Sequence, residues 1–184
     1  MKTEYGFSEN QIKKRQDEIN RIAEFYNFDG VFSLEFPPAN LENIPKATLI
    51  QKAAEVIDSV QITEIFLPFF GDAHSDHKIV FESFFSACKS FRRPSVKRVL
   101  CYETLSETNF GIRHCGRDFV PNVYENISNS FAKKMEALDI YEGEFLEHPF
   151  PRSKISVKAL AQLRGSECRS QFAEAFFLVK EIIE

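Results

Sequence analysis

The feature of this 184-residue sequence that most constrains its fold is a short apolar run, residues 63–69, followed at once by the polar segment 71–77. The run is too short for a helix and is typical of a parallel strand that is covered on both faces. From Ser75 onward, apolar residues return at helical spacing, so we expect a loop and then a helix that packs on the strand. A strand, a loop and a helix in this order make up the first part of a βαβ unit.

Strand and helix patterns alternate along the rest of the chain. Ser8 and Gln11 are spaced as a capping box, Pro45 can open the second helix, and Ser128 is expected to cap the fourth. In the last apolar stretch, 173–183, we expect a helical start that passes into a final strand. The other expected helices and strands are helices over 8–26, 45–59, 75–88, 128–138 and 156–165, and strands over 31–36, 63–69, 96–103 and 119–127.

This alternation predicts a Rossmann-like α/β fold. Strands that alternate with helices form βαβ units, in which right-handed crossovers join parallel strands. We therefore expect a mostly parallel sheet with helices on both faces. A chain of 184 residues can bury one core without disulfides or a structural metal, so we expect a single domain over residues 1–184.

Composition excludes several classes of protein and partner. The balance of 23 Lys+Arg against 27 Asp+Glu gives a net charge of −4, and the absence of a long basic run argues against nucleic-acid binding. The sequence has no signal-peptide pattern and no apolar run near roughly 18 residues, so we expect a cytoplasmic protein without a membrane span. The cysteines form no C-x-x-C pair and are expected to be reduced, structural thiols: Cys88, Cys101, Cys115 and Cys168.

The segment 71–77 holds the one constellation of residues that favours chemistry. In open α/β sheets, ligands bind at the carboxyl ends of the strands, which is where this segment must lie. His74 and His77 place two imidazoles three residues apart, with the carboxylate of Asp76 between them. A metal ligand and a histidine held in its charged form are both available. In the alternative interpretation, the carboxylate of Asp76 only offsets the partial positive charge at the helix N-terminus, and the two histidines are solvated loop residues.

Other candidates lack a supporting pattern. His114 and His148 lie in irregular loops, and Glu103 ends a predicted strand, where an acid can also cap the next turn. No residue near either histidine has metal-ligand spacing, and completion of a rearranged site by His114, Glu103 or His148 stays an alternative. The sequence contains no G-x-G-x-x-G, P-loop or G-x-S-x-G motif, so nucleotide-binding and serine-hydrolase functions have no support.

Together with the run before it, segment 71–77 resembles the second motif, H-x-D-H, of the PIG-L/LmbE-like N-deacetylases. Further stretches are similar in order and spacing to the bacterial members of that family, and the similarity covers nearly the whole chain. The H-x-D-H residues are the most specific part of it. The other similar stretches are Tyr102-Glu103-Thr104, Pro121-Asn122-Val123-Tyr124, Pro151-Arg152-Ser153, Leu163-Arg164-Gly165, Ala173-Glu174-Ala175-Phe176, and residues 15–23, which resemble the R-x-x-E helix of the family.

The resemblance implies a zinc-dependent hydrolase that removes the acetyl group from an N-acetylated sugar. It assigns zinc binding to His77, stabilisation of the transition state to His74, and to Asp76 the role of orienting and charging its neighbour. Zinc would lower the pKa of its bound water toward roughly 7 and polarise the amide carbonyl, while a positive imidazole faces the developing oxyanion.

The chain departs from the family at one motif. The H-P-D-D sequence, which in the family supplies two further zinc ligands and the general base, occurs nowhere in this sequence. One of three protein ligands remains, so we expect His77 alone to bind zinc weakly. We expect the given chain to be a fragment or late-start product that lacks the family's first βαβ portion. A degenerate paralogue with a rearranged sheet and a partner chain that supplies the strand are the alternatives.

Two functions from different classes remain open. The leading hypothesis is a deacetylase-family hydrolase that acts on an N-acetylglucosamine-type glycoconjugate when its site is complete. The alternative is a non-catalytic paralogue that serves as a sugar-binding or structural subunit. The sequence does not identify the substrate-binding residues, and exposed strand edges make self-association into a homo-oligomer an expectation.

Overall fold

The computed structural model describes residues 6–111, 116 and 118–183, and these form two compact units. The first unit combines Met1–Pro38 with Asn126–Phe172, and the second combines Ala39–Glu125 with Ala173–Glu184. Each unit is therefore assembled from two stretches that are far apart in the sequence.

The sheet has four strands, in the order β1-β2-β4-β3. Strand β1 (Glu64–Pro68) is parallel to β2 (Arg98–Tyr102), while β4 (Ala173–Glu181) is antiparallel to β2. The remaining strand, β3 (Val123–Asn126), lies at the edge of the sheet beyond β4. The predicted α/β class is confirmed.

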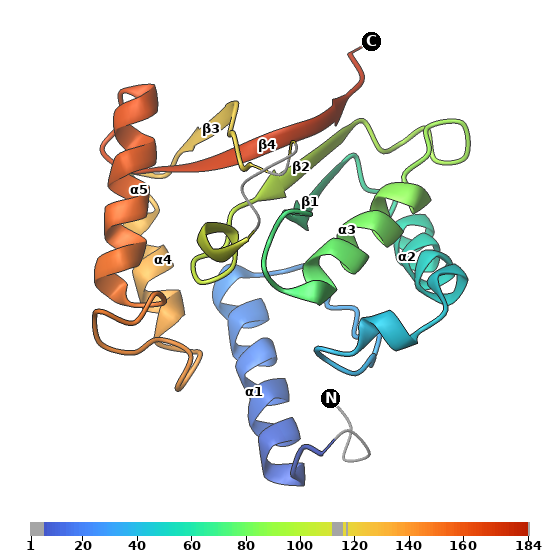
Figure 1. Ribbon diagram of the computed structural model, residues 1–184, viewed down its shortest axis with the longest axis horizontal. Coiled ribbons are helices and arrows are strands. Elements are labelled where there is room, and N and C mark those ends of the chain that lie inside the picture. Colours follow the sequence, from blue (N-terminus) through green and yellow to red (C-terminus); the bar gives the residue numbers. More distant parts are fainter. Residues whose placement is uncertain (1–5, 112–115, 117, 184) are drawn as a thin grey trace. The chain divides into compact units, whose positions relative to one another are not determined.

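In the second unit, two helices and the sheet build the main core. The helices α2 (Lys46–Val60) and α3 (Ser75–Ala87) lie side by side, and α3 packs against β1 (Figure 1). The buried residues of this core come from both helices, from β1 and β2 and from the adjoining loops: Ala53, Ile57, Leu67, Phe69, Ala87, Cys88, Val96, Val99 and Cys101. The predicted strand–loop–helix sequence around residues 63–88 is therefore confirmed. Two short 3₁₀ helices belong to the same unit, η2 (Leu41–Asn43) and η3 (Thr108–Phe110).

The first unit consists of helices with smaller apolar clusters. They are α1 (Glu9–Tyr26), α4 (Phe131–Leu138) and α5 (Lys154–Cys168). The predicted capping box begins α1, since the Ser8 side chain accepts from the Gln11 N–H and the Gln11 side chain accepts from the Ser8 N–H. None of the helices within the described residues is long and apolar enough to cross a bilayer.

Three local predictions of secondary structure are wrong. Residues 31–36 form no strand, and Val31 and Phe32 are half exposed, because an apolar, strand-like composition gives a strand only where a neighbouring strand completes the ladder. The stretch from Ala173 is strand throughout rather than helical at its start, because it pairs with β2. Helix α4 begins after Ser130 instead of Ser128, whose hydroxyl accepts from the Phe172 N–H.

Strand β1 is not covered on both faces, contrary to the expectation for residues 63–69. The side chain of Phe66 is 47% exposed, although its ring contacts that of Phe176 on β4 at 5.1 Å between centroids. Leu67 and Phe69, which belong to the buried core, are covered as predicted.

Candidate functional site

The candidate site is the loop that joins β1 to α3. Because β1 and β2 are parallel, their carboxyl ends lie at the same edge of the sheet, and this loop leaves from that edge. Main-chain contacts brace it: the Ala73 N–H donates to the Glu107 carbonyl at 3.2 Å, and the backbone of Gly111 lies directly against the Gly71 carbonyl. The loop therefore has a defined shape at the position that the sequence predicts.

His77 lies in the first turn of α3 and is bound to a buried carboxylate. Its Nδ1 is 2.7 Å from Oδ2 of Asp72, a side chain with no exposed surface, while the His77 side chain is 23% exposed. Opposite an ionised carboxylate, which can only accept a hydrogen bond, Nδ1 of His77 carries the proton and donates. In the neutral form of the ring, Nε2 then holds a lone pair, which can bind a metal or accept a proton.

His74 is the N-cap residue of α3 and is held in the opposite way. Its Nδ1 accepts from the backbone N–H of Asp76 at 3.1 Å, so its ring proton is on Nε2. The rings of His74 and His77 stack, with 5.1 Å between centroids and 13° between planes. Asp76 thus orients His74 through its backbone N–H and not through its carboxylate.

The carboxylate of Asp76 binds a second loop. Its two oxygens accept from the backbone N–H groups of Ala39, at 2.6 Å, and Leu41, at 3.2 Å. An acidic side chain in the first turn of a helix is also favoured by the helix dipole. Asp76 therefore ties the start of α3 to the segment that leads into η2.

Two protonated groups on β2 lie within the electrostatic reach of Asp72. Burial raises the pKa of the Cys101 thiol to about 12, and the negative charge of Asp72 adds to the shift. Burial likewise raises the pKa of the Tyr102 phenol, again with a contribution from Asp72. Both groups keep their protons at neutral pH, so neither can act there as a base or a thiolate nucleophile.

The donor set at this site does not by itself build a zinc site. Catalytic zinc normally has three protein ligands, and within the described ranges no group of three or more His, Cys, Asp or Glu residues could hold a metal ion. Nε2 of His77 is the one nitrogen that the geometry presents as a lone pair here. The second oxygen of Asp72, Oδ1, is buried and has no hydrogen-bond partner among the described residues.

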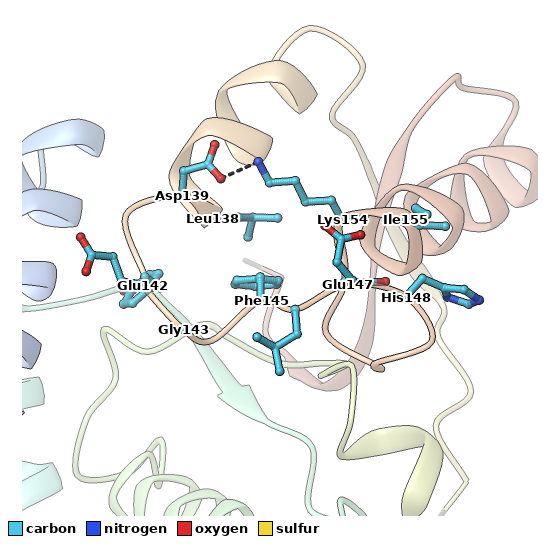
Figure 2. Close-up of a pocket in the computed structure, with 12 residues that line it drawn as sticks. Leu138, Asp139, Glu142, Gly143, Phe145, Glu147, His148, Lys154 and Ile155 are labelled. Atoms are coloured by element: carbon cyan, nitrogen blue, oxygen red, sulfur yellow. Dashed lines mark ion pairs between the residues drawn. The ribbon is translucent and has the colours of Figure 1, made fainter.

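The other sequence candidates are Glu103, His114 and His148. Glu103 follows β2 at the same edge of the sheet, whereas His114 and Cys115 lie outside the described residues. His148 belongs to the first unit, where it lines a cavity of about 380 Å³ with its ring pointing away from Leu138 and Phe145 (Figure 2).

That cavity combines apolar and charged side chains but no metal-ligand cluster. Asp139 and Lys154, which both line it, form an ion pair of 2.5 Å (Figure 2). In the same unit, Arg15 and Glu18 of the helix that resembles the R-x-x-E motif form an ion pair of 3.1 Å, and Arg15 also pairs with Glu144. These pairs link α1 to the segment between α4 and α5.

Sequence reasoning placed His74, Asp76 and His77 in one turn but missed Asp72. A separation of five residues matches neither the helical nor the strand period, so no periodic pattern joins Asp72 to His77. The available signal was a carboxylate that follows Gly71 directly after a buried strand, inside the loop that carries the histidines.

The comparisons with known proteins concern the fold. No protein-family model matches the sequence. The chain is similar to the conserved protein TT1542 from Thermus thermophilus, with 19% identity and a TM-score of 0.72 over 94% of this chain and 75% of that one. It is also similar to an N,N'-diacetylchitobiose deacetylase from Pyrococcus horikoshii, with 13% identity and a TM-score of 0.71 over 91% of this chain and 64% of that one.

A third solved structure widens the range of reactions found on this fold. GalB, the 4-carboxy-2-hydroxymuconate hydratase from Pseudomonas putida KT2440, has 16% identity and a TM-score of 0.64 over 97% of this chain and 76% of that one. At such identities the similarity shows the fold alone, which this chain shares with a deacetylase and with a hydratase. The reaction has to be argued from the site.

Proposed function

We propose that this protein is a hydrolase of the deacetylase type, which cleaves the acetamide of an N-acetylglucosamine-type glycoconjugate when its site is complete. The observation that carries the proposal is the stacked pair of His74 and His77 at the β1–α3 junction. It is supported by the fold that the chain shares with a deacetylase of N,N'-diacetylchitobiose.

Each histidine has a role that suits amide hydrolysis. His74 offers the N–H of its Nε2 to the oxygen on which negative charge develops when the amide carbonyl is attacked, and Asp76 orients this ring. His77 offers a lone pair and is the proposed zinc ligand. Zinc, when bound, would polarise the carbonyl and activate water, but it requires further ligands beyond His77.

The test is release of acetate from N,N'-diacetylchitobiose and N-acetylglucosamine, with and without added Zn²⁺. It uses the chain itself and the chain fused to a βαβ unit that carries H-P-D-D. We expect the fusion to release acetate in a zinc-dependent reaction. His77→Ala should abolish this release, and His74→Ala should lower its rate by about 10²–10³-fold, as for the loss of one oxyanion donor. His148→Ala is the matched control and should leave the rate unchanged. A folded, zinc-supplemented fusion that releases no acetate would remove the basis of this proposal.

The second candidate is a non-catalytic sugar-binding or structural subunit. It is favoured by the absence, within the described ranges, of a group of three or more metal-ligating residues. Titration calorimetry with the same sugars distinguishes the two functions. Binding that a chelator leaves unchanged supports the subunit, whereas one tightly bound zinc ion per chain counts against it.

A further inference from the structure

Asp72 has a buried carboxylate with few partners. Its side chain has no exposed surface, Oδ2 contacts Nδ1 of His77 at 2.7 Å, and Oδ1 has no partner among the described residues. Burying a carboxylate with one oxygen unsatisfied costs folding free energy. Asp72 therefore lowers the free energy of unfolding, and its contact with His77 is the role that its burial serves.

The contact determines where the proton of His77 lies. Neutral imidazole has one N–H and one lone pair, and the hydrogen bond at one nitrogen determines the group presented at the other. With the Asp72 carboxylate 2.7 Å from Nδ1, the neutral ring takes the Nδ1–H form, and its Nε2 is then the acceptor. Truncation of Asp72 would leave both tautomers available to His77.

His74 provides the opposite arrangement in the adjacent ring. The backbone N–H of Asp76 donates to its Nδ1 at 3.1 Å, which leaves the proton on Nε2. Both rings are thus fixed at Nδ1, one by an acceptor and one by a donor, and they are stacked 5.1 Å apart. Their Nε2 atoms offer a lone pair and an N–H within one site.

We propose that Asp72 is a positioning residue, which holds His77 as the Nδ1–H tautomer so that the stacked histidines present one acceptor and one donor at Nε2. The ligand class that fits such a pair is a carbonyl compound: its oxygen accepts from His74, while an electrophile or a proton donor occupies His77. That the carbonyl compound is an amide rests on the proposed function. The assignment of the two tautomers does not depend on it.

Long-range ¹H–¹⁵N correlation spectra of the metal-free, ¹⁵N-labelled full chain at pH 8 test the proposal directly. These spectra distinguish the two neutral tautomers from each other and from the imidazolium cation, in which both nitrogens carry a proton. His→Gln variants at the four histidines assign the signals. We expect the Nδ1–H pattern for His77 and the Nε2–H pattern for His74, and an Nε2–H pattern at His77 in the wild-type chain would overturn the proposal.

Asp72→Ala provides the second measurement, with Asp58→Ala as the matched control. Asp58 is an exposed carboxylate of the same unit, and it pairs with Arg93 instead of a histidine. We expect Asp72→Ala to shift the His77 signals to the Nε2–H pattern or to an average of both, and Asp58→Ala to leave them unchanged. A native-like Asp72→Ala chain that retains the Nδ1–H pattern contradicts the proposal. If this variant does not fold, the wild-type spectrum decides by itself.

The outcome is separable from that of the deacetylation assay. The spectra need neither zinc nor substrate, so opposite tautomers in a chain that releases no acetate would leave this inference standing without the proposed reaction. Acetate release by a chain whose His77 is the Nε2–H tautomer would do the reverse.

Discussion

At the scale of single residues, the histidine loop depends on a glycine from another loop. A Cβ atom at Gly111 would lie 2.1 Å from the Gly71 carbonyl oxygen and 3.4 Å from the Ala73 nitrogen. The first distance is far shorter than any real contact, and the neighbouring atoms belong to the backbone. The two loops can approach so closely only because position 111 has no side chain.

Gly111→Ala should therefore both destabilise the protein and disturb the site. We expect a loss of about 1–3 kcal/mol in the free energy of unfolding, the usual cost of overpacking, together with shifts of the His74 and His77 imidazole signals. Urea denaturation and the same NMR spectra measure both effects. The matched control is Gly30→Ala, where the added methyl would meet only a ring carbon of Phe32 at 3.9 Å. Equal behaviour of the two variants would disprove the bracing role of Gly111.

The limit of sequence reasoning at this scale is visible in Asp72 and Asp76. Spacing placed Asp76 in the first turn of a helix, which is local information. The contacts of its carboxylate with Ala39 and Leu41 and the burial of Asp72 depend on how loops close, which no periodic pattern encodes.

At the scale of elements, helix signals in the sequence were accurate where the capping residues bond to each other, but not at Ser128, which bonds to Phe172 instead. The capping box of Ser8 and Gln11 is an example, because its two hydrogen bonds, of 3.3 and 2.9 Å, involve residues three positions apart. The strand signals of residues 31–36 and the helical signals after Ala173 were misleading. In those segments the outcome depends on whether a partner strand is present, and β2 provides one only for the second.

The capping box predicts a measurable contribution to stability. Ser8→Ala removes the acceptor for the Gln11 N–H, and we expect the free energy of unfolding to fall by about 1 kcal/mol. Thermal and urea denaturation measure the change. Ser59→Ala is the comparison, since this exposed serine of α2 donates to the Val56 carbonyl of its own helix and should contribute little. A Ser8→Ala variant as stable as Ser59→Ala would show that the box is not formed in solution.

At the scale of the whole molecule, the chain passes between its two compact units three times. It changes unit after Pro38, after Glu125 and after Phe172, so neither unit is a continuous segment. Neither can therefore be obtained by cutting the chain once. The expectation that residues 1–184 behave as a single domain stays a prediction.

Global stability should decrease on the alkaline side because of the buried thiol of Cys101. Its pKa is raised to about 12 by burial, whereas an unfolded thiol ionises near 8.5. Between these values the unfolded chain has lost a proton that the folded chain retains, so raising the pH favours unfolding. The slope is at most about 1.4 kcal/mol per pH unit for one such group, and the stabilisation is fully present below about pH 8.5.

Urea denaturation at pH 8 and pH 10 tests this in the wild-type chain and in Cys101→Ala, under reducing conditions. We expect the wild-type chain to lose more stability between the two pH values than the variant does. Cys88, whose pKa is also raised by burial, is present in both proteins and cancels in the comparison. Identical losses would show that the Cys101 thiol titrates normally in the folded state.

The main-chain bracing of the histidine loop also bears on how this protein can evolve. The contacts run from Ala73 to the carbonyl of Glu107 and from Gly71 to the backbone of Gly111, so the side chains at positions such as Phe110, which is 64% exposed, take no part in them. Mutations at those positions can alter what the loop presents to a ligand while the histidines stay in place. The shape of the histidine loop and the side chains around it are thus inherited separately, and a lineage can change the surface beside the histidines without displacing them.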